Sequence, residues 1–246
     1  MRGRPLLRSL AFAMAGLFFV STLLTLLDQL NLIYQPPAIP DSANLVERVT
    51  ALIPYRHDVW PLFFLENALA GLGFLVLVGL GLVLATRVAR SDDRRLLLLW
   101  TFLVAGVIGV IAETVVIGAV KAAIDVPYCD CGFKDQEIVS QVWAEMVVQS
   151  AGAVLIDAAA LLAAAGLVVG GVLFGGSLMP ASWRLLSFGA AALLVLSVIL
   201  GWADIASDAN SWLTAAITGL AIPAWAVWIG LRFPDTGPVD PESAGA

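Results

Sequence analysis

The sequence predicts an all-α fold, a polytopic six-helix transmembrane bundle with both termini inside (N-in/C-in). Of its 246 residues, 60% are hydrophobic and only 13% are charged, which would leave a water-soluble domain of this size with much exposed apolar surface. A helix needs about 20 apolar residues to cross a hydrocarbon core roughly 30 Å thick. Six stretches reach that length, so the lipid bilayer is the expected surrounding of the chain.

The spans follow one another without a linker or an internal repeat. The first follows Arg2, Arg4 and Arg8, as in a signal peptide, but it is too long and lacks a small-residue cleavage site, which predicts a retained signal anchor. Pro223 is expected to kink the last span. We expect one transmembrane domain over residues 1–232 and a disordered tail over 233–246. The predicted spans are 9–27, 61–86, 96–120, 147–174, 185–202 and 212–232.

The distribution of charge predicts the orientation. With the N-terminus in the cytoplasm, nine of the 13 Lys and Arg residues fall on the cytoplasmic side, in agreement with the positive-inside rule. Tryptophans gather near span ends, where amphipathic rings prefer the headgroup level. We therefore expect a multi-pass protein of the cell membrane with both termini cytoplasmic. The net charge of −6 and the scattered basic residues argue against nucleic-acid binding.

The first external loop, residues 35–60, is longer than a bundle needs. Part of it has apolar residues at helical spacing, which predicts a short amphipathic helix that Pro54 ends. This helix would lie on the outer membrane face or over the mouth of the bundle. The residues at this spacing are Leu45, Val49, Leu52 and Ile53.

Three acids lie within the predicted spans: Glu66, Glu113 and Asp157. Charge facing lipid is costly, so such acids are expected to face protein or water. Counted along the helices, Glu66 lies about 8 Å and Glu113 about 10 Å below the outer ends of their spans, and Asp157 lies near the midplane. Asn67 and Gln149 extend these acids into a candidate polar strip or ion-binding site.

Small residues share helix faces with two of the acids, and such faces allow helices to approach closely. Between the span ends, no Lys, Arg or His is available to neutralise the acids, and two interpretations remain. Either each acid is a neutral carboxyl that joins helices by a hydrogen bond, or the acids line a polar funnel, open to the outside, that binds protons, cations or a cationic solute. The faces are Ala153, Asp157, Ala160 and Ala164 in span four and Ala105, Gly109 and Glu113 in span three.

Cys129 and Cys131 lie in the external loop between spans three and four. An oxidising exterior permits a disulfide, within the loop or between chains, although a C-x-C ring is tight and strained. Two free thiols, metal binding and redox chemistry stay open as alternatives. These cysteines and His57, the single histidine, are too few for a four-ligand zinc site, so no metal and no cofactor are expected.

No motif in the sequence names a substrate or a reaction. An enzyme is the least favoured class, because neither a nucleophile–base pair nor a metal-ligand set is visible. The function predicted first is a non-enzymatic accessory or partner-binding membrane component, working with another membrane protein or as a homo-oligomer. The alternative is a transporter of a small solute, coupled to a cation or to protons, that uses the buried acids.

Overall fold

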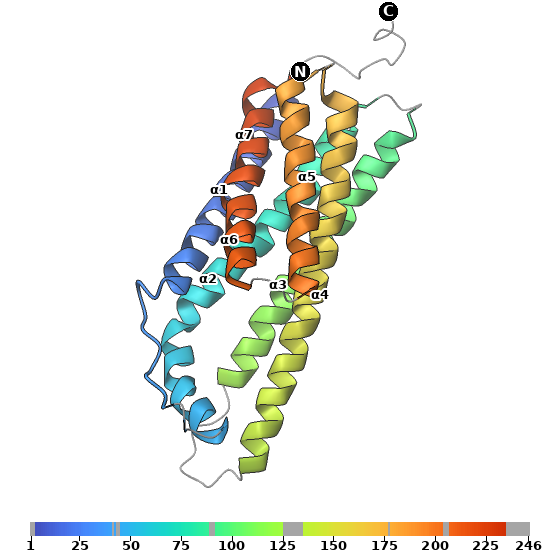
Figure 1. The fold of residues 1–246 in the computed structure, drawn as a ribbon. Coiled ribbons are helices and arrows are strands. Elements are labelled where there is room, and N and C mark those ends of the chain that lie inside the picture. The colour runs from blue at the N-terminus through green and yellow to red at the C-terminus, as the bar shows by residue number, and fades with distance from the viewer. Residues whose placement is uncertain are drawn as a thin grey trace, which may run out of the picture.

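The structure is a computed structural model that describes residues 3–40, 42, 45–88, 92–124, 135–176, 178–203 and 207–234. These residues form an elongated bundle of helices (Figure 1). They include no strand, and an isolated bridge joins Gly175 to Met179. The helices are α1 (Gly3–Gln29), α2 (Leu45–Ala85), α3 (Arg94–Ile124), α4 (Asp135–Phe174), α5 (Ala181–Trp202), α6 (Ser207–Ala216) and α7 (Ile222–Arg232), with a π-helical segment η1 (Ile217–Ala221) between α6 and α7.

Six helical stretches of the described chain are long and apolar enough to cross a membrane, which confirms the predicted number and order of spans. The protein is an integral, multi-pass membrane protein. Helix α1 begins and α7 ends at one end of the bundle, here called the terminal end (Figure 1). The opposite end is called the distal end, and the sequence predicts that it is external. The stretches are Pro5–Gln29, Tyr55–Ala85, Arg94–Ala122, Met146–Phe174, Ala181–Trp202 and Asn210–Arg232.

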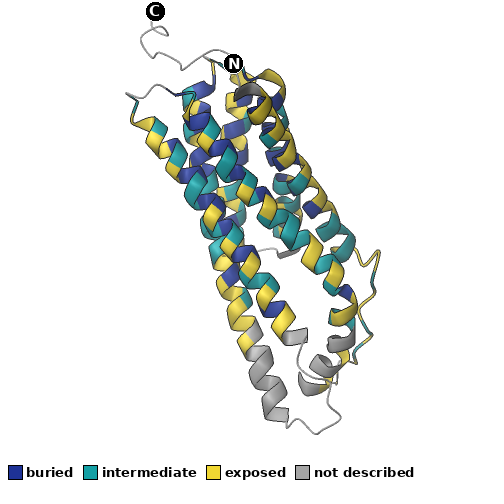
Figure 2. Ribbon diagram, turned by 180° about the vertical axis from the view of Figure 1, so that it is seen from behind, coloured by how far each residue is buried: buried dark blue, intermediate teal, exposed yellow. Residues whose placement is uncertain are grey.

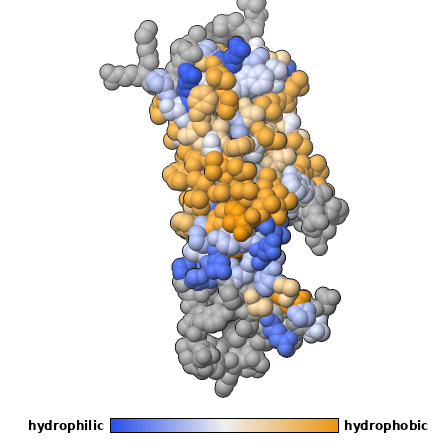
Figure 3. Space-filling model, turned by 90° about the vertical axis from the view of Figure 1, so that its left-hand side faces the viewer, coloured by the Kyte–Doolittle hydropathy of each residue, from blue (hydrophilic) through white to orange (hydrophobic). Residues whose placement is uncertain are grey.

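The surface carries the apolar zone that a bilayer requires. Figure 3 shows it on one face of the molecule, with hydrophilic residues gathered toward both ends. Large apolar side chains are exposed on several helices, among them Leu75 at 57%, Leu185 at 69% and Leu220 at 65%. Apolar surface of this extent is stable in contact with lipid and promotes aggregation in water.

The closely packed core lies in the half of the bundle nearer the terminal end, where buried residues gather in Figure 2. At its centre, Trp183 of α5 stacks on Trp225 of α7 with ring centroids 5.8 Å apart, and both residues are fully buried. The indole Nε1 of Trp225 donates a 2.9 Å hydrogen bond to Ser187 Oγ. Phe102 of α3 packs against the same indole, with ring centroids 6.0 Å apart. This core holds α3, α5 and α7 together on the terminal side of the site described next.

The residues of the predicted external helix are helical, but they do not form a separate helix. Helix α2 begins at Leu45 and continues through Pro54 to Ala85, so the expectation that Pro54 ends a helix is wrong. His57, in the same predicted loop, is also part of α2, and its side chain is 74% exposed. A proline removes one backbone donor, and a helix tolerates this loss when the residues on both sides keep their hydrogen bonds.

Span six changes its helical form near Pro223, where the sequence predicts a kink. The five residues of η1 separate α6 from α7 and end two positions before Pro223. Proline cannot donate a backbone hydrogen bond, and its ring crowds the carbonyl four residues earlier, here that of Gly219 in η1. A π-helical turn accommodates this conflict by widening, and such turns often occur at functional sites.

Two predictions concern the ends of the described ranges. Phe233, which the sequence analysis assigns to the disordered tail, is 3% exposed and packs edge-on against Phe174, with ring centroids 5.3 Å apart. The rest of that tail beyond Pro234 lies outside the described residues, as do Cys129 and Cys131.

Candidate functional site

A polar cavity of about 380 Å³ lies near the end of α1 and the beginning of α6, mainly between α1, α2 and α6. Two acids line it, Glu66 of α2 and Glu113 of α3, and hydroxyl and amide groups supply most of its other polar surface. None of the described residues in its lining is Lys, Arg or His. The lining consists of Phe18, Ser21, Thr22, Thr25, Gln29, Glu66, Asn67, Ala70, Phe74, Glu113, Ile156, Asn210, Ser211, Thr214, Ala215 and Thr218.

Glu66 is positioned by contacts with α1 and with its own helix. The Ser21 hydroxyl of α1 donates a 2.9 Å hydrogen bond to the main-chain carbonyl of Glu66, which joins the two helices. The Asn67 amide Nδ2 donates to the Phe63 carbonyl at 2.7 Å and lies 3.4 Å from Glu66 Oε1. One carboxyl oxygen of Glu66 therefore has a weak donor nearby. The Thr25 hydroxyl also lies close to the carboxyl but donates to the Ser21 carbonyl at 3.1 Å, so Oε2 is buried without a hydrogen-bond partner.

Glu113 reaches the same cavity because α3 approaches α2 closely. It is only 7% exposed, and a Cβ placed on Gly71 of α2 would lie 3.5 Å from the Glu113 Cβ. One turn away on α3, a Cβ placed on Gly109 would overlap the ring of Phe74 on α2. Gly109 and Glu113, which share a predicted face, thus both contact α2. Small residues at these points let the backbones approach until the two acids line one cavity.

Three carboxyl groups form a series in this region. Glu66 is close enough to Asp28 of α1 and to Glu113 for their charges to interact. Each of the three has one buried oxygen without a hydrogen-bond partner: Asp28 Oδ1, Glu66 Oε2 and Glu113 Oε2. Most buried polar atoms in proteins are paired, so three unpaired oxygens in one region need a cause. Glu66 and Glu113 line the cavity and Asp28 does not, so a hydrogen-bond donor bound there could partner the two glutamate oxygens.

Helix α1 presents a polar stripe to the cavity and ends beside it. Asn31 adopts a left-handed φ of 51°, a conformation that Asn tolerates better than most residues. The amide of Leu32 donates to the Leu27 carbonyl at 3.0 Å, as in a Schellman cap. This cap stops the helix directly after Gln29. The stripe consists of Ser21, Thr25 and Gln29, spaced four residues apart on one face.

The opposite wall carries a second polar stripe, from α6 into η1. Its members, Asn210, Thr214 and Thr218, are again four residues apart. The hydroxyl of Thr218, in η1, lies 2.9 Å from that of Thr22 on α1 and also donates to the Thr214 carbonyl at 2.9 Å. The Thr214 hydroxyl lies 2.8 Å from that of Ser197 on α5. These hydrogen bonds connect α1, span six and α5 around the cavity.

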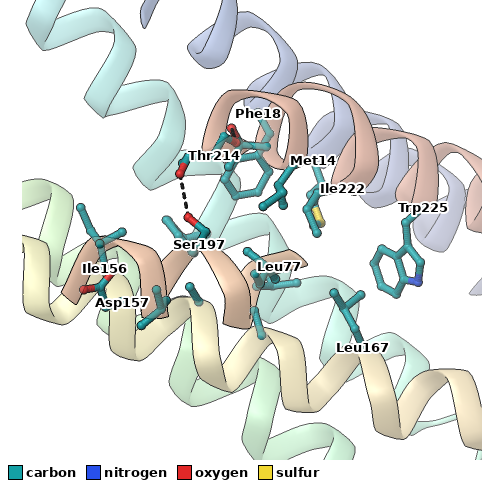
Figure 4. A pocket seen from close by; sticks show the side chains of 18 of the residues that line it. Met14, Phe18, Leu77, Ile156, Asp157, Leu167, Ser197, Thr214, Ile222 and Trp225 are labelled. Carbon is teal, nitrogen blue, oxygen red and sulfur yellow. Dashed lines mark hydrogen bonds between the residues drawn. The ribbon is translucent and has the colours of Figure 1, made fainter. Parts of the chain in front are cut away.

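A second cavity, of about 180 Å³, adjoins the polar one and extends toward the terminal end. In Figure 4, Asp157 lies at one end of it and Trp225 at the other, with apolar side chains between them. The rings of Phe18 and Phe74 border both cavities and meet edge to face, with centroids 5.4 Å apart. The other residues that border both are Ile156, Asn210, Thr214 and Thr218.

Asp157 contacts the end of a neighbouring helix. Its Oδ2 accepts a 2.7 Å hydrogen bond from Trp202 Nε1, and Trp202 is the last residue of α5. Asp157 itself lies near the middle of α4, which has 40 residues. Its depth in the bilayer, near the midplane according to the sequence, stays a prediction.

The structure brings together part of the predicted polar strip. Glu66, Asn67 and Glu113 line the polar cavity, and Asp157 lines the apolar cavity beside it. Gln149 is half-buried on α4 and is not among the described residues that line either cavity. Within the described ranges, no group of three His, Cys, Asp or Glu side chains could hold a metal ion.

Asp28 and both polar stripes belong to the site but were not predicted from the sequence. Asp28 follows directly after residue 27, the predicted end of span one, and the structure includes it in the apolar stretch Pro5–Gln29. The stripes did leave a signal, because polar residues four apart share a helix face. Ser and Thr hydroxyls in membrane helices often donate a hydrogen bond to a carbonyl of their own helix. Polar residues four apart are therefore found both in cavity walls and in ordinary helix packing, and the spacing alone does not distinguish the two.

Comparisons of the chain with protein-family models, with curated proteins and with solved structures find no match. Function must therefore be inferred from the site itself.

Proposed function

We propose that this integral membrane protein binds a small organic cation, an ammonium compound, between Glu66 and Glu113 in the polar cavity. The observation that carries the proposal is that both carboxyls line one cavity and each has a buried oxygen without a hydrogen-bond partner. Ionised carboxyls without a counter-charge are costly inside a membrane protein. A protonated amine supplies both the positive charge and the N–H donors.

The size and polar groups of the cavity favour an organic cation over a bare metal ion. A volume of about 380 Å³ is large for a single ion. Metal ions such as Ca²⁺ take six to eight oxygen ligands at short distance, whereas this lining offers two carboxyls and dispersed neutral groups. An ammonium group needs only two or three acceptors. Glu66 and Glu113 supply them, and the hydroxyls of Thr22 and Thr25 offer further ones.

This proposal places solute binding ahead of the accessory or partner-binding role that the sequence analysis ranks first. The non-enzymatic character stays a prediction from the sequence. Transport of the solute, the alternative from sequence, would require a second state with access from the other side. Binding is the step that the cavity supports.

Equilibrium binding of radiolabelled methylammonium to the purified full-length protein in detergent tests this proposal. We expect saturable binding of one cation per chain. Glu66→Gln and Glu113→Gln should each weaken it at least about tenfold, because each removes one of two charge-assisted partners. Asp58→Asn is the matched control, since Asp58 lies on the same helix as Glu66 with its side chain 69% exposed.

The wild-type result is decisive by itself. If methylammonium shows no saturable binding to folded wild-type protein, the proposal fails. It also fails if both Gln variants bind methylammonium as tightly as the wild type and Asp58→Asn do.

A further inference from the structure

We infer that the solute is an amphiphilic monoamine, with its ammonium group between Glu66 and Glu113 and an apolar body the size of a benzene ring in the adjoining cavity. This inference rests on the cation binding proposed above and specifies the chemistry of the ligand. It joins the polar cavity to the adjoining apolar cavity, which no pattern in the sequence predicts. Each of them alone would hold only half of such a molecule.

The apolar cavity has the volume and lining for a ring or a short branched alkyl group. It measures about 180 Å³, and an engineered apolar cavity of about 150 Å³ in another protein binds benzene. Its walls include Met14, Leu77 and Leu167, of which Leu77 is 3% and Leu167 2% exposed. These side chains offer dispersion contacts to an apolar body and no hydrogen bonds.

The junction of the two cavities suits the bond between an ammonium group and an apolar body. Phe18 and Phe74 border both cavities, so a molecule that occupies both passes these rings. An aromatic face attracts a cation on one side and offers apolar contact on the other. Glu113, on the polar side, is buried with one oxygen unpartnered, which gives the ammonium group a fixed position.

The far end of the apolar cavity is a rigid wall that limits the length of the ligand. Trp225 closes it, and this indole is fully buried, stacked on Trp183 and hydrogen-bonded to Ser187. A long alkyl chain would have to displace this packed ring. The site therefore favours a compact body over a lipid-like tail.

The test compares three amines on the full-length wild-type protein in detergent: methylammonium, phenethylammonium and dodecylammonium. Phenethylammonium should bind at least about tenfold more tightly than methylammonium, because burial of each apolar carbon contributes to the affinity. Dodecylammonium should not bind more tightly than phenethylammonium when each is measured below its micellar concentration.

Two variants of α4 locate the apolar body. Ala160 lines the apolar cavity and not the polar one, so Ala160→Leu should fill part of the apolar cavity. It should weaken the binding of phenethylammonium about tenfold and leave the affinity for methylammonium unchanged. Ala165→Leu is the control, since Ala165 is exposed on the same helix. Each variant is used only if it melts as the wild type does.

The outcomes separate this inference from the function on which it rests. If methylammonium binds and phenethylammonium binds no more tightly, the inference is wrong and cation binding stands. If Ala160→Leu weakens both amines equally, the apolar cavity does not hold the body and the inference is again wrong. If neither amine binds the wild type, both the inference and the proposed function fail.

Discussion

The indole Nε1 of Trp202 donates a 2.7 Å hydrogen bond to Oδ2 of Asp157, joining α5 to α4 at the distal end of α5. Glu66 and Glu113 differ from Asp157, because each retains a buried oxygen without a hydrogen-bond partner. The two interpretations of the acids in the spans therefore apply to different residues. The contact of Asp157 favours a role in helix packing, and the surroundings of Glu66 and Glu113 favour ligand binding.

The Asp157 contact predicts an asymmetry between two substitutions. Asp157→Asn keeps an oxygen that accepts from the indole and should change the free energy of unfolding by less than about 0.5 kcal/mol. Asp157→Leu removes the acceptor and should cost about 0.5–1.5 kcal/mol, the usual net contribution of one hydrogen bond. Denaturation of the purified variants in detergent measures both changes.

A double-mutant cycle with Trp202→Phe tests whether the indole is the partner that matters. If it is, the Asp157→Leu/Trp202→Phe double variant should be little less stable than the Trp202→Phe single variant. Strictly additive losses would show that Asp157 stabilises the protein through some other contact.

Two glycines of α3 should respond oppositely to the same substitution. Gly109→Ala places a Cβ against the Phe74 ring and should cost about 1–3 kcal/mol through overpacking. Gly118→Ala meets nothing within 4 Å and should leave the melting temperature unchanged or higher, because alanine favours the helix. Thermal melts of the two variants in one detergent give the comparison. Equal melting temperatures would contradict the close α2–α3 contact that brings Glu113 to the cavity.

The hydroxyl of Ser187 should matter far more than that of Ser150, although both donate to the carbonyl four residues earlier. Ser187 also accepts from the buried Trp225 indole, so Ser187→Ala leaves that N–H unpaired and should cost about 1–3 kcal/mol. Ser150→Ala, on the exposed face of α4, should cost less than about 0.5 kcal/mol. Chemical denaturation measures both, and a Ser187→Ala protein as stable as Ser150→Ala would count against the Trp225–Ser187 contact.

Labelling of single cysteines tests the predicted orientation. Ser42 and Asp93 are exposed and precede α2 and α3, which begin at opposite ends of the bundle (Figure 1). In a background with Cys129 and Cys131 replaced by Ser, Ser42→Cys should react with an impermeant maleimide on intact cells, and Asp93→Cys should react only after permeabilisation. The excess of Lys and Arg on the terminal side motivates this expectation. The reverse labelling pattern would invert the topology.

Part of the candidate site could be predicted from individual residues. Glu66 and Glu113 stood out because an acid is costly in a run of apolar residues, whatever it contacts. Asp28 was missed because a helix cap beyond Gln29, and not hydropathy, decides where α1 ends. The hydroxyls of Thr22 and Thr218 were missed because their 2.9 Å contact joins residues 196 positions apart in the chain.

The sequence by itself determined that six segments can span a bilayer and that Glu66, Glu113 and Asp157 lie within them, because both follow from the transfer of residues from water to lipid, a property of each segment alone. Only the tertiary structure decided that Glu66 and Glu113 line one cavity while Asp157 pairs with Trp202. Helix lengths, the close approach at Gly71 and Gly109 and the π-helical turn at Thr218 set these relationships. They depend on how helices pack against one another, and packing in a membrane is directed by shape and by polar pairs, which hydropathy along one helix does not encode.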